Sequence, residues 1–484
     1  MMLLISGILE NAADVAPDAL AATMGDETLT FGEIERAGNR IAGALLASGI
    51  GRGDRVLWWG ETSLEAIPVF AGAAKIGAVF APLNARATLE EIVPVAEYAR
   101  ASVVLSSASH GPQATELARR LGIPCELHAP DADHEGDRRP NVELDENDPH
   151  VIFFTSGSTG RPKGVVLSHR VNWLRTYVGG TTSPGGGGTV CMFPLFHMAG
   201  WTIALGAWQA RRAVHFVTVP DAATLLSTTE RHRASRLYCI PAVWGRILQH
   251  GVTGYDLSSL VEADTGTSAT PPELLTAIKA ALPHTVTRVF YGSTEAGPTL
   301  SLPDADLVRK PGSVGISQPG VEVRVDERGE VIARSPFLMD GYFDDPDSTA
   351  EALVDGWYHT GDLGVMDDDG YIAIVGRARD VIRTGGETVA PPEVEAVLGD
   401  HPDVLEVAVV GVPDMEWGEV VTAVIVARPD APAVTVESLR TFCADRLAGF
   451  KHPRRVAIVD SLPRTAATGQ IQRPLIVEQL QQQS

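Results

Sequence analysis

Basic residues are scarce in this sequence of 484 residues: 39 Lys and Arg stand against 61 Asp and Glu, a formal net charge of -22. A surface of that sign repels nucleic acids and anionic membranes, so we expect neither as a main partner. Glycine-rich loops and a few fixed cations must therefore hold any anionic ligand locally. The rest of the composition, 44% hydrophobic and 21% charged, is typical of a soluble globular protein.

Cysteine and long apolar runs are also scarce. The four cysteines, Cys125, Cys191, Cys239 and Cys443, lie far apart without the spacing of metal ligands, and we interpret them as buried free thiols. The apolar start MMLLISGIL is short and lacks a basic flank, which makes it a poor signal peptide. No apolar run is long enough to span a bilayer. We therefore expect a cytoplasmic protein without a transmembrane segment.

The chain is too long for one ordinary core, which indicates two or three domains. Helix and strand patterns alternate through its first two-thirds. Thr30 and Glu33 have the spacing of a capping box at the start of a helix. The apolar runs DRVLWWG and GAVFAPLN predict strands on either side of a second helix. This alternation predicts parallel sheets covered by helices.

The pattern changes in the last third of the chain. Residues 312–337 contain short strand patterns between Gly and Pro turns, which predict a small barrel-like β element. Beyond them we expect a compact unit with two long strands and a helix that carries Leu439, Phe442 and Leu447.

We place the domain boundary within GRARD, so that residues 1–378 form a large N-terminal domain and residues 379–484 a small C-terminal domain. The predicted fold class is α/β. Doubly wound sheets and the small β-barrel element make up the large domain, and the small domain is α+β.

The strongest functional motif is FFTSGSTGRPKGVVLSH, in which an apolar strand runs into a loop of glycine and hydroxyl residues. Glycines let backbone N–H groups converge on phosphate oxygens. The hydroxyl donors are Thr155, Ser156, Ser158 and Thr159. Lys163 adds a positive charge, and no Gly-Lys-Ser/Thr opens a helix as in the Walker pattern. The length and order of the motif favour a phosphate-binding loop over an ordinary solvated Ser/Gly loop.

Three further motifs carry candidate residues. In YGSTEAG, Glu295 stands beside a hydroxyl at a strand end, where a carboxylate can hold a hard cation such as magnesium. In GWYHTGDLG, Asp362 is expected in a turn and can accept two hydroxyl hydrogen bonds, as from a ribose. In GRARDVIRTGGETVAPPEVE, Arg377 is a candidate for a ribose or phosphate contact. Glu387 and Glu393 are more typical of helix-start or solvated acids.

In this order, TSGSTGRPKG, YGSTEAG, YHTGD and GRARDVIRTGGE resemble the adenylate-forming superfamily and, within it, the acyl-CoA synthetases of the fatty-acid–CoA ligase type. The resemblance covers nearly the whole chain. It implies that an apolar carboxylic acid, fatty or aryl, is activated with ATP to acyl-AMP and pyrophosphate, and that the acyl group then passes to CoA. The implied cofactors are ATP, magnesium (Mg2+) and CoA as co-substrate, the small domain is implied to be mobile, and a homodimer is left open.

The same resemblance implies roles for individual positions. The implied nucleotide-binding residues are Thr155, Ser156, Gly157, Ser158, Thr159, Gly160, Lys163, Gly266, Thr267, Ser268, Tyr291, Gly292, Ser293, Thr294, Asp362 and Arg377. The implied catalytic set is Lys163, Thr294, Glu295 and Gln470, and the implied magnesium ligands are Glu295 and Thr155. Arg379 falls at the hinge between the domains, and Gly385, Gly386 and Glu387 at the CoA side.

The acyl pocket is less clearly marked. The residues implied to border it are His197, Trp201, Trp244 and Gly266. For His197 a buried core histidine is an equal alternative, and a tryptophan is more often a core residue than a specificity determinant. The stretch DTGTSATPPEL keeps only the alanine of the family's commoner Gly-Gly-Ala-Pro, at Ala269. No acidic residue stands in FHMAG, which favours an acid without an α-amine.

Gln470 is the departure that matters most. In the family, the loop written PRTxTGKIxR carries a lysine that contacts the substrate carboxylate, and here TGQIQR places a neutral amide at that position. Loss of one such charge-stabilising group costs about 3–4 kcal/mol, or about 10² to 10³ in rate. Lys451 lies on a different loop and is not expected to substitute. We therefore hypothesise impaired adenylation, through either an engineered exchange or a natural variant.

Two alternatives remain open. The chain could be an adenylating enzyme with another acceptor, such as a carrier-protein thiol or a luciferase-like reaction. It could also be a catalytically inactive homologue that binds acyl groups or nucleotides, and Gln470 is the feature that raises this alternative.

Overall fold

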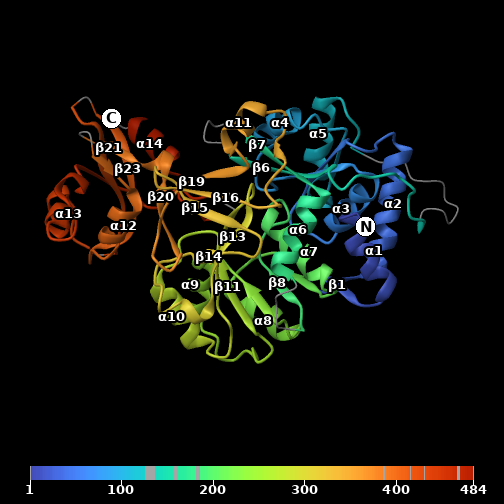
Figure 1. Ribbon diagram of the computed structural model, residues 1–484, viewed down its shortest axis with the longest axis horizontal. Coiled ribbons are helices and arrows are strands. Elements are labelled where there is room, and N and C mark those ends of the chain that lie inside the picture. Colours follow the sequence, from blue (N-terminus) through green and yellow to red (C-terminus); the bar gives the residue numbers. More distant parts are fainter. Residues whose placement is uncertain are drawn as a thin grey trace. The chain divides into compact units, whose positions relative to one another are not determined.

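The computed structural model describes residues 2–125, 137–156, 162–180, 186–384, 387–414, 416–429, 431–465 and 469–482 (Figure 1). It has a mixed α/β fold, as predicted. The chain forms two compact units: a large unit, Met1–Val323 with Ala333–Tyr358, and a small unit, Arg324–Ile332 with His359–Ser484. The boundary placed between residues 378 and 379 stays a prediction.

A nine-stranded sheet in the large unit has the order β14-β13-β12-β11-β10-β8-β9-β1-β2. Its strands are β1 Leu20–Met24, β2 Glu27–Thr30, β8 Thr189–Cys191, β9 Val214–Phe216, β10 Arg236–Tyr238, β11 Glu262–Gly266, β12 Val289–Ser293, β13 Gly297–Leu302 and β14 Ile316–Ser317. The six inner strands from β12 to β1 are parallel, and the edge strands β14, β13 and β2 pair antiparallel. The chain crosses over between neighbours, as expected for helix-covered parallel strands.

A six-stranded sheet in the same unit has the order β17-β7-β6-β4-β3-β5. Its strands are β3 Arg55–Trp59, β4 Val79–Leu83, β5 Val103–Ser106, β6 Pro149–Ser156, β7 Pro162–Ser168 and β17 Gly341–Tyr342. The strands predicted in DRVLWWG and GAVFAPLN are β3 and β4, and they pair in parallel with Arg55 opposite Val79.

Helices pack around these sheets. They are α1 Ser6–Val15, α2 Phe31–Ala47, α3 Ala66–Ile76, α4 Leu89–Tyr98, α5 Gly111–Leu121, α6 His169–Gly180, α7 Met198–Gln209, α8 Ala222–Arg231, α9 Pro241–His250, α10 Pro272–Ala281 and α11 Pro346–Ala352. The predicted capping box of α2 is confirmed: the Thr30 Oγ1 accepts from the Glu33 N–H at 3.2 Å, and the Glu33 carboxylate accepts from the Thr30 N–H at 2.8 Å.

Helices α1, α2 and α3 lie together near the N-terminus (Figure 1). A buried lysine links the three helices: the Lys75 ammonium on α3 pairs with Glu10 of α1 at 2.8 Å and with Glu35 of α2 at 2.9 Å. A Cβ at Gly72 would lie 2.7 Å from the Ile41 side chain, so glycine permits the close approach of α2 and α3.

The remaining strands form two five-stranded sheets. The first, β15-β16-β19-β18 with β20 paired to β19, carries residues of both units. Its strands are β15 Glu322–Val325, β16 Glu330–Arg334, β18 Leu353–Val354, β19 Trp357–Met366 and β20 Ile372–Arg377. The strands predicted within residues 312–337 therefore divide, because β14 joins the nine-stranded sheet and β15 and β16 join this one.

The second five-stranded sheet is the core of the small unit, in the order β22-β21-β24-β23 with β25 paired to β24. Its strands are β21 Ile382–Thr384, β22 Glu387–Val389, β23 Val404–Asp414, β24 Gly418–Ala427 and β25 Arg455–Ile458. The helices of this unit are α12 Pro391–Gly399, α13 Val436–Cys443 and α14 Arg473–Gln482. The prediction that one helix carries Leu447 is wrong, since α13 ends at Cys443; Leu447 packs against the same core from the following turn.

Three of the four cysteines are buried and all four are free, while Cys125 is only half-buried, contrary to the prediction. Burial raises the pKa of the Cys191 thiol to about 12, so it stays protonated at neutral pH. Within the described part of the chain, no helix combines the length and apolar composition that a membrane crossing requires.

Candidate active site

The turn between β12 and β13 holds the predicted metal-binding acid. Strand β12 ends at Ser293 and β13 begins at Gly297, so Glu295 follows a strand end, as predicted, and sits in the turn before the next strand. Its Oε1 accepts a hydrogen bond from the Tyr342 hydroxyl at 3.2 Å. Tyr358 is hydrogen-bonded to the Ser293 side chain nearby. Burial and the Glu295 carboxylate raise the pKa of both phenols, so they stay protonated as donors.

The predicted phosphate loop lies between two paired strands. Strands β6 and β7 pair antiparallel with Thr155 opposite Lys163, and the Thr155 hydroxyl donates to the Lys163 carbonyl at 3.5 Å. The Lys163 ammonium stands 4.6 Å from the centre of the Tyr342 ring, within cation–π range. Tyr342 thus contacts both Lys163 and Glu295, and the structure brings these two predicted residues together. Gly157, Ser158, Thr159 and Gly160 lie outside the described residues, as does the side chain of Ser156.

The predicted adenine-side residues end two neighbouring parallel strands. Gly266 ends β11 and lies opposite Phe290 of β12. Tyr291, Gly292 and Ser293 follow Phe290 and end β12. Gly266 has φ +153°, and a Cβ there would lie 2.2 Å from the Phe290 carbonyl oxygen, so only glycine fits. Thr267 follows with φ +67°, and its hydroxyl donates to the Gly266 carbonyl at 2.6 Å. Ser268 comes next at the same edge. Ligands in open α/β sheets bind outside the carboxyl ends of the strands, which is where these residues lie.

In the small unit, Asp362 and Arg377 face each other on β19 and β20. The Arg377 Nε lies 2.8 Å from the Asp362 Oδ1, and Asp362 is buried. The prediction that Asp362 sits in a turn is wrong, because it lies inside β19. The preceding Gly361 has φ +70° and a bulge follows at Leu363, so the glycines that suggested a turn are accommodated within a paired strand.

The predicted acyl-pocket residues differ in their surroundings. Trp201 on α7 stacks on Phe70 at 4.0 Å, and its indole N–H donates to the Leu195 carbonyl at 2.6 Å. Trp244 on α9 is fully buried and donates to the Asp264 carbonyl at 2.9 Å. Both indoles are therefore core residues with satisfied N–H groups.

His197 precedes α7 and is half-buried. Its buried Nε2 has no hydrogen-bond partner among the described residues, and burial lowers the pKa of the imidazole to about 4. A neutral ring with an unused nitrogen remains compatible with a substrate contact.

Residues on both sides of the Gln470 segment hydrogen-bond to one another. The Thr465 N–H donates to the Gln470 carbonyl at 2.7 Å, and the Gln470 N–H donates to the Thr465 hydroxyl at 3.1 Å. Arg464 donates to the Gly469 carbonyl at 2.9 Å and pairs with Glu406 at 2.6 Å. These contacts join Arg464 and Thr465 to Gly469 and Gln470, and residue 470 is exposed, while residues 466–468 lie outside the described residues.

Other predicted residues of the small unit lie on separate elements. Lys451 forms an ion pair with Glu393 in the first turn of α12. Arg379 lies in a 3-10 turn, Ala378–Asp380, with its Nε 3.6 Å from an Asp380 oxygen. Glu387 is exposed at the start of β22, while Gly385 and Gly386 lie outside the described residues.

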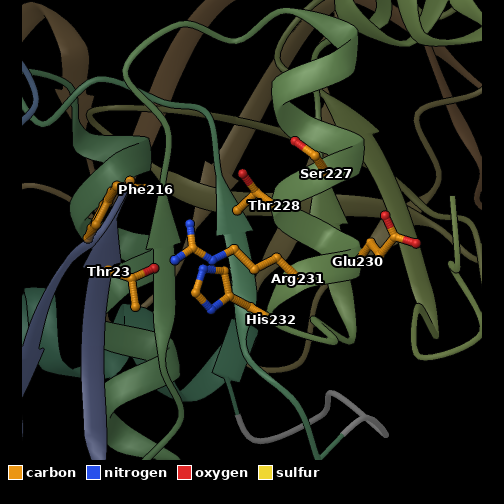
Figure 2. Close-up of a pocket in the computed structure, with 8 residues that line it drawn as sticks. Thr23, Phe216, Ser227, Thr228, Glu230, Arg231 and His232 are labelled. Carbon is orange, nitrogen blue, oxygen red and sulfur yellow. The ribbon is translucent and has the colours of Figure 1, made fainter.

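One cavity lies away from all of these positions. Its volume is about 380 Å³. Figure 2 shows Arg231 and His232 side by side at the end of α8, extending toward Thr23 of β1. The His232 ring stacks on the His215 ring at 4.2 Å. None of the predicted site residues lines this cavity.

Sequence reasoning missed three residues around the Glu295 turn: Tyr342, Tyr358 and Arg175. Tyr358 lies within the quoted motif YHTGD, so the motif itself could have indicated it. Tyr342 and Arg175 stand in ordinary strand and helix patterns, and only the fold brings them to the turn.

Residues 9–343 match the family described as AMP-binding enzyme, and residues 393–468 match the AMP-binding enzyme C-terminal domain. The chain is similar to a feruloyl-CoA synthase of an Amycolatopsis species, with 34% identity over 474 residues that cover 94% of this chain and 95% of the relative. It is 32% identical over 507 residues to the long-chain-fatty-acid–CoA ligase FadD13 of Mycobacterium tuberculosis, covering 98% of each.

Among solved structures, ATP-bound MatB from Rhodopseudomonas palustris has a TM-score of 0.86 and 28% identity, with 98% of each chain covered. This likeness extends over both parts of the chain, the large N-terminal part with its sheets and the smaller C-terminal part. The chain therefore belongs to the AMP-binding enzymes, and its predicted place in the adenylate-forming superfamily, among the acyl-CoA synthetases, is confirmed.

Proposed function

We propose that the protein is an acid–CoA ligase that activates an apolar carboxylic acid, fatty or aryl, with ATP and transfers the acyl group to CoA. The main observation behind the proposal is that Lys163 and Glu295 both contact Tyr342, near the carboxyl end of β12. The names of the relatives, a feruloyl-CoA synthase and a long-chain-fatty-acid–CoA ligase, support the class of substrate. We place the reaction in the cytoplasm, where ATP and CoA are both present.

The chemistry requires fixed positive charge, because the attacking carboxylate and the triphosphate are both anionic. Glu295 and Thr155 offer a carboxylate and a hydroxyl, the hard oxygen donors that magnesium prefers, and the Tyr342 hydrogen bond orients the Glu295 carboxylate. Bound magnesium would neutralise charge between the reactants. Lys163 supplies a second cation beside the loop 155–160, and Thr294 faces the nucleotide or the acid.

Separate groups of residues would hold the adenine and the ribose of the nucleoside. In this proposal Gly266, Thr267 and Ser268 border the adenine from one strand, and Tyr291, Gly292 and Ser293 from the next. Asp362 accepts the ribose hydroxyls while Arg377, 2.8 Å away, orients its carboxylate. His197, Trp201 and Trp244 border the acyl group.

The CoA step uses another face of the small domain. We propose that residues 379–484 turn about Arg379 between the half-reactions and present Gly385, Gly386 and Glu387 to CoA. A rotation of this kind lets one pocket serve two steps in turn.

Gln470 lowers the rate of the first half-reaction, adenylation. Its amide can donate a hydrogen bond to the acid, but charge-assisted bonds are about twice as strong as neutral ones. The described residues beside position 470 are hydrogen-bonded to one another, so we propose that adenylation is slowed by the missing charge. Lys451 does not supply the charge, because it pairs with Glu393.

The test is an acid-panel assay on the chain with Gln470→Lys, measuring AMP release and thioester formation with CoA. We expect thioesters from fatty or aryl acids and none from amino acids. Acyl-AMP that accumulates without thioester would identify another acceptor. Failure to consume ATP with any acid would favour a binding protein without catalysis. The original chain, supplied with ready-made acyl-AMP, should still form thioester, and sedimentation of the same sample would decide between a monomer and a homodimer.

A further inference from the structure

A guanidinium lies buried beneath the Glu295 turn. Arg175 on α6 is 0% exposed. Its Nη1 donates to the Thr294 carbonyl at 2.8 Å, its Nη2 to the Glu295 carbonyl at 2.8 Å, and its Nε to the Phe337 carbonyl at 3.0 Å. Nη1 also approaches the Met198 sulfur at 3.0 Å. One side chain thus binds the backbone of both turn residues to which the proposed function assigns roles.

The cost of burying this charge indicates what it does. A guanidinium taken out of water is unfavourable unless its donors are satisfied, and a side chain that only filled space would be apolar. Burial lowers the pKa of Arg175 to about 10, opposed by the charges of Glu295 and Asp340, so it stays protonated at neutral pH. Arg175 donates to three carbonyls and a thioether, which its planar guanidinium can hold in a fixed mutual geometry.

The turn is fixed from a second side by the segment that carries Tyr342. The Met339 N–H donates to the same Glu295 carbonyl at 2.7 Å, and Phe337 accepts from Arg175. Arg175 therefore links the turn to residues 337–342, whose Tyr342 hydroxyl contacts the Glu295 carboxylate. Backbone and carboxylate of Glu295 are held by one connected set of hydrogen bonds.

The last glycine of YGSTEAG makes room for this contact. Gly297 has φ +68°, a conformation that side chains other than glycine rarely adopt. A Cβ at Gly297 would lie 2.9 Å from the Arg175 Nε. The glycine therefore has a physical role in the motif: it lets the guanidinium reach the turn.

We propose that Arg175 is a positioning residue for adenylation, fixing the carbonyls of Thr294 and Glu295 and so the direction in which the Glu295 carboxylate meets magnesium. The proposal rests on the proposed function and goes beyond it, since Arg175 touches neither nucleotide nor acid in it. A lysine at position 175 keeps the charge but lacks the planar guanidinium, so it cannot hold both carbonyls in the same geometry.

The test uses the Gln470→Lys chain as parent, measuring pyrophosphate exchange against magnesium concentration. Arg175→Lys should raise the magnesium concentration for half-maximal rate by about 10- to 100-fold, as loss of a ligand-orienting contact does. Excess magnesium should restore part of the rate, and thioester formation from supplied acyl-AMP should change less than adenylation. Lys75→Arg, a matched exchange of another buried cation, should leave the magnesium dependence at the parent value.

Gly297→Ala keeps the guanidinium and crowds it, so it should shift the magnesium dependence in the same direction even if Arg175→Lys fails to fold. Each outcome has one meaning. A parent that does not exchange pyrophosphate contradicts the proposed function. A parent that exchanges, with folded variants that keep its magnesium dependence or lose both half-reactions equally, overturns the positioning role.

Discussion

The Glu295 turn of the large unit and the Gln470 loop of the small unit differ in the charge of the side chain that each presents. In each, hydrogen bonds between a side chain and a backbone group hold the residue to which we assign a function. The Glu295 turn keeps its charged residue and is held by a fully buried arginine. The Gln470 loop is held by contacts at the surface and presents a neutral amide. The described residues beside position 470 are thus hydrogen-bonded although the side chain at that position is neutral.

The difference also concerns how each turn would respond to mutation. Arg175 bonds carbonyls of three residues far along the chain, so a change there disturbs several segments at once. Arg464 and Thr465 bond Gly469 and residue 470 close by in the chain, and Arg464 also pairs with Glu406. We therefore expect a side-chain exchange at residue 470 to leave the rest of the small unit unchanged.

The largest effect is expected at the charged turn. Glu295→Gln in the Gln470→Lys parent should lower pyrophosphate exchange by about 10³, because it removes charge where the transition state needs it. The exchange rate at saturating ATP measures it. The exposed Glu322→Gln is the matched control and should keep the parent rate. A Glu295→Gln rate within tenfold of the parent would show that the carboxylate is not required.

The second prediction concerns acid stability of the large unit. Burial lowers the pKa of His169 from 6.5 to about 4. The unfolded chain therefore binds a proton below pH 6.5 that the folded chain does not, so the stability contributed by the neutral ring is complete above pH 6.5 and is lost as pH falls toward 4. By pH 5 the loss is about 2 kcal/mol.

Denaturant unfolding at pH 7.5 and pH 5 checks this. His169→Gln should lose about 2 kcal/mol less than the unsubstituted chain over that interval. The exposed His250→Gln should behave as the unsubstituted chain does. An equal loss in all three would mean that His169 does not titrate on unfolding.

The third prediction tests the pair in the small unit. Arg377→Met removes the partner of Asp362, and we expect the KM for ATP to rise about tenfold, a modest value because Arg377 is partly exposed. ATP titration of the exchange reaction in the Gln470→Lys parent measures it. Arg328→Met, an exposed change in the same unit, should have no effect. An unchanged KM would separate this pair from the nucleotide.

The smallest effect is expected within the Gln470 loop. Thr465→Val in the Gln470→Lys parent removes the hydroxyl that accepts from the N–H of residue 470, which is worth about 1 kcal/mol. Exchange should fall severalfold, and Thr441→Val on α13 should leave it unchanged. If Thr465→Val exchanges like the parent, the Thr465 hydroxyl does not position residue 470.

Local chemistry made much of the fold predictable. The capping box at Thr30 and the strands β3 and β4 depend on neighbours in sequence, and they were predicted correctly. The turn assigned to Asp362 was wrong because pairing with β20, a nonlocal contact, decides that segment. Leu447 kept its predicted place in the core but not in the helix, because apolar spacing does not distinguish a helix from a packed turn.

The site was predictable where motifs carry it and not where distant segments meet. Glu295 and Lys163 stand in quoted motifs, and the fold brings them to one tyrosine. Arg175 is one of two arginines in α6, and the carbonyls that it binds lie 119 to 162 residues away. Nothing local to α6 distinguishes that arginine from a solvated one.

The most direct measurement is pyrophosphate exchange by this chain and by its Gln470→Lys variant, at matched ATP, magnesium and acid. Gln481→Lys on α14, an exposed exchange of the same type in the same unit, is the control for added charge. The account predicts a rise of about 10² to 10³ for Gln470→Lys alone. Equal rates for all three chains would contradict it.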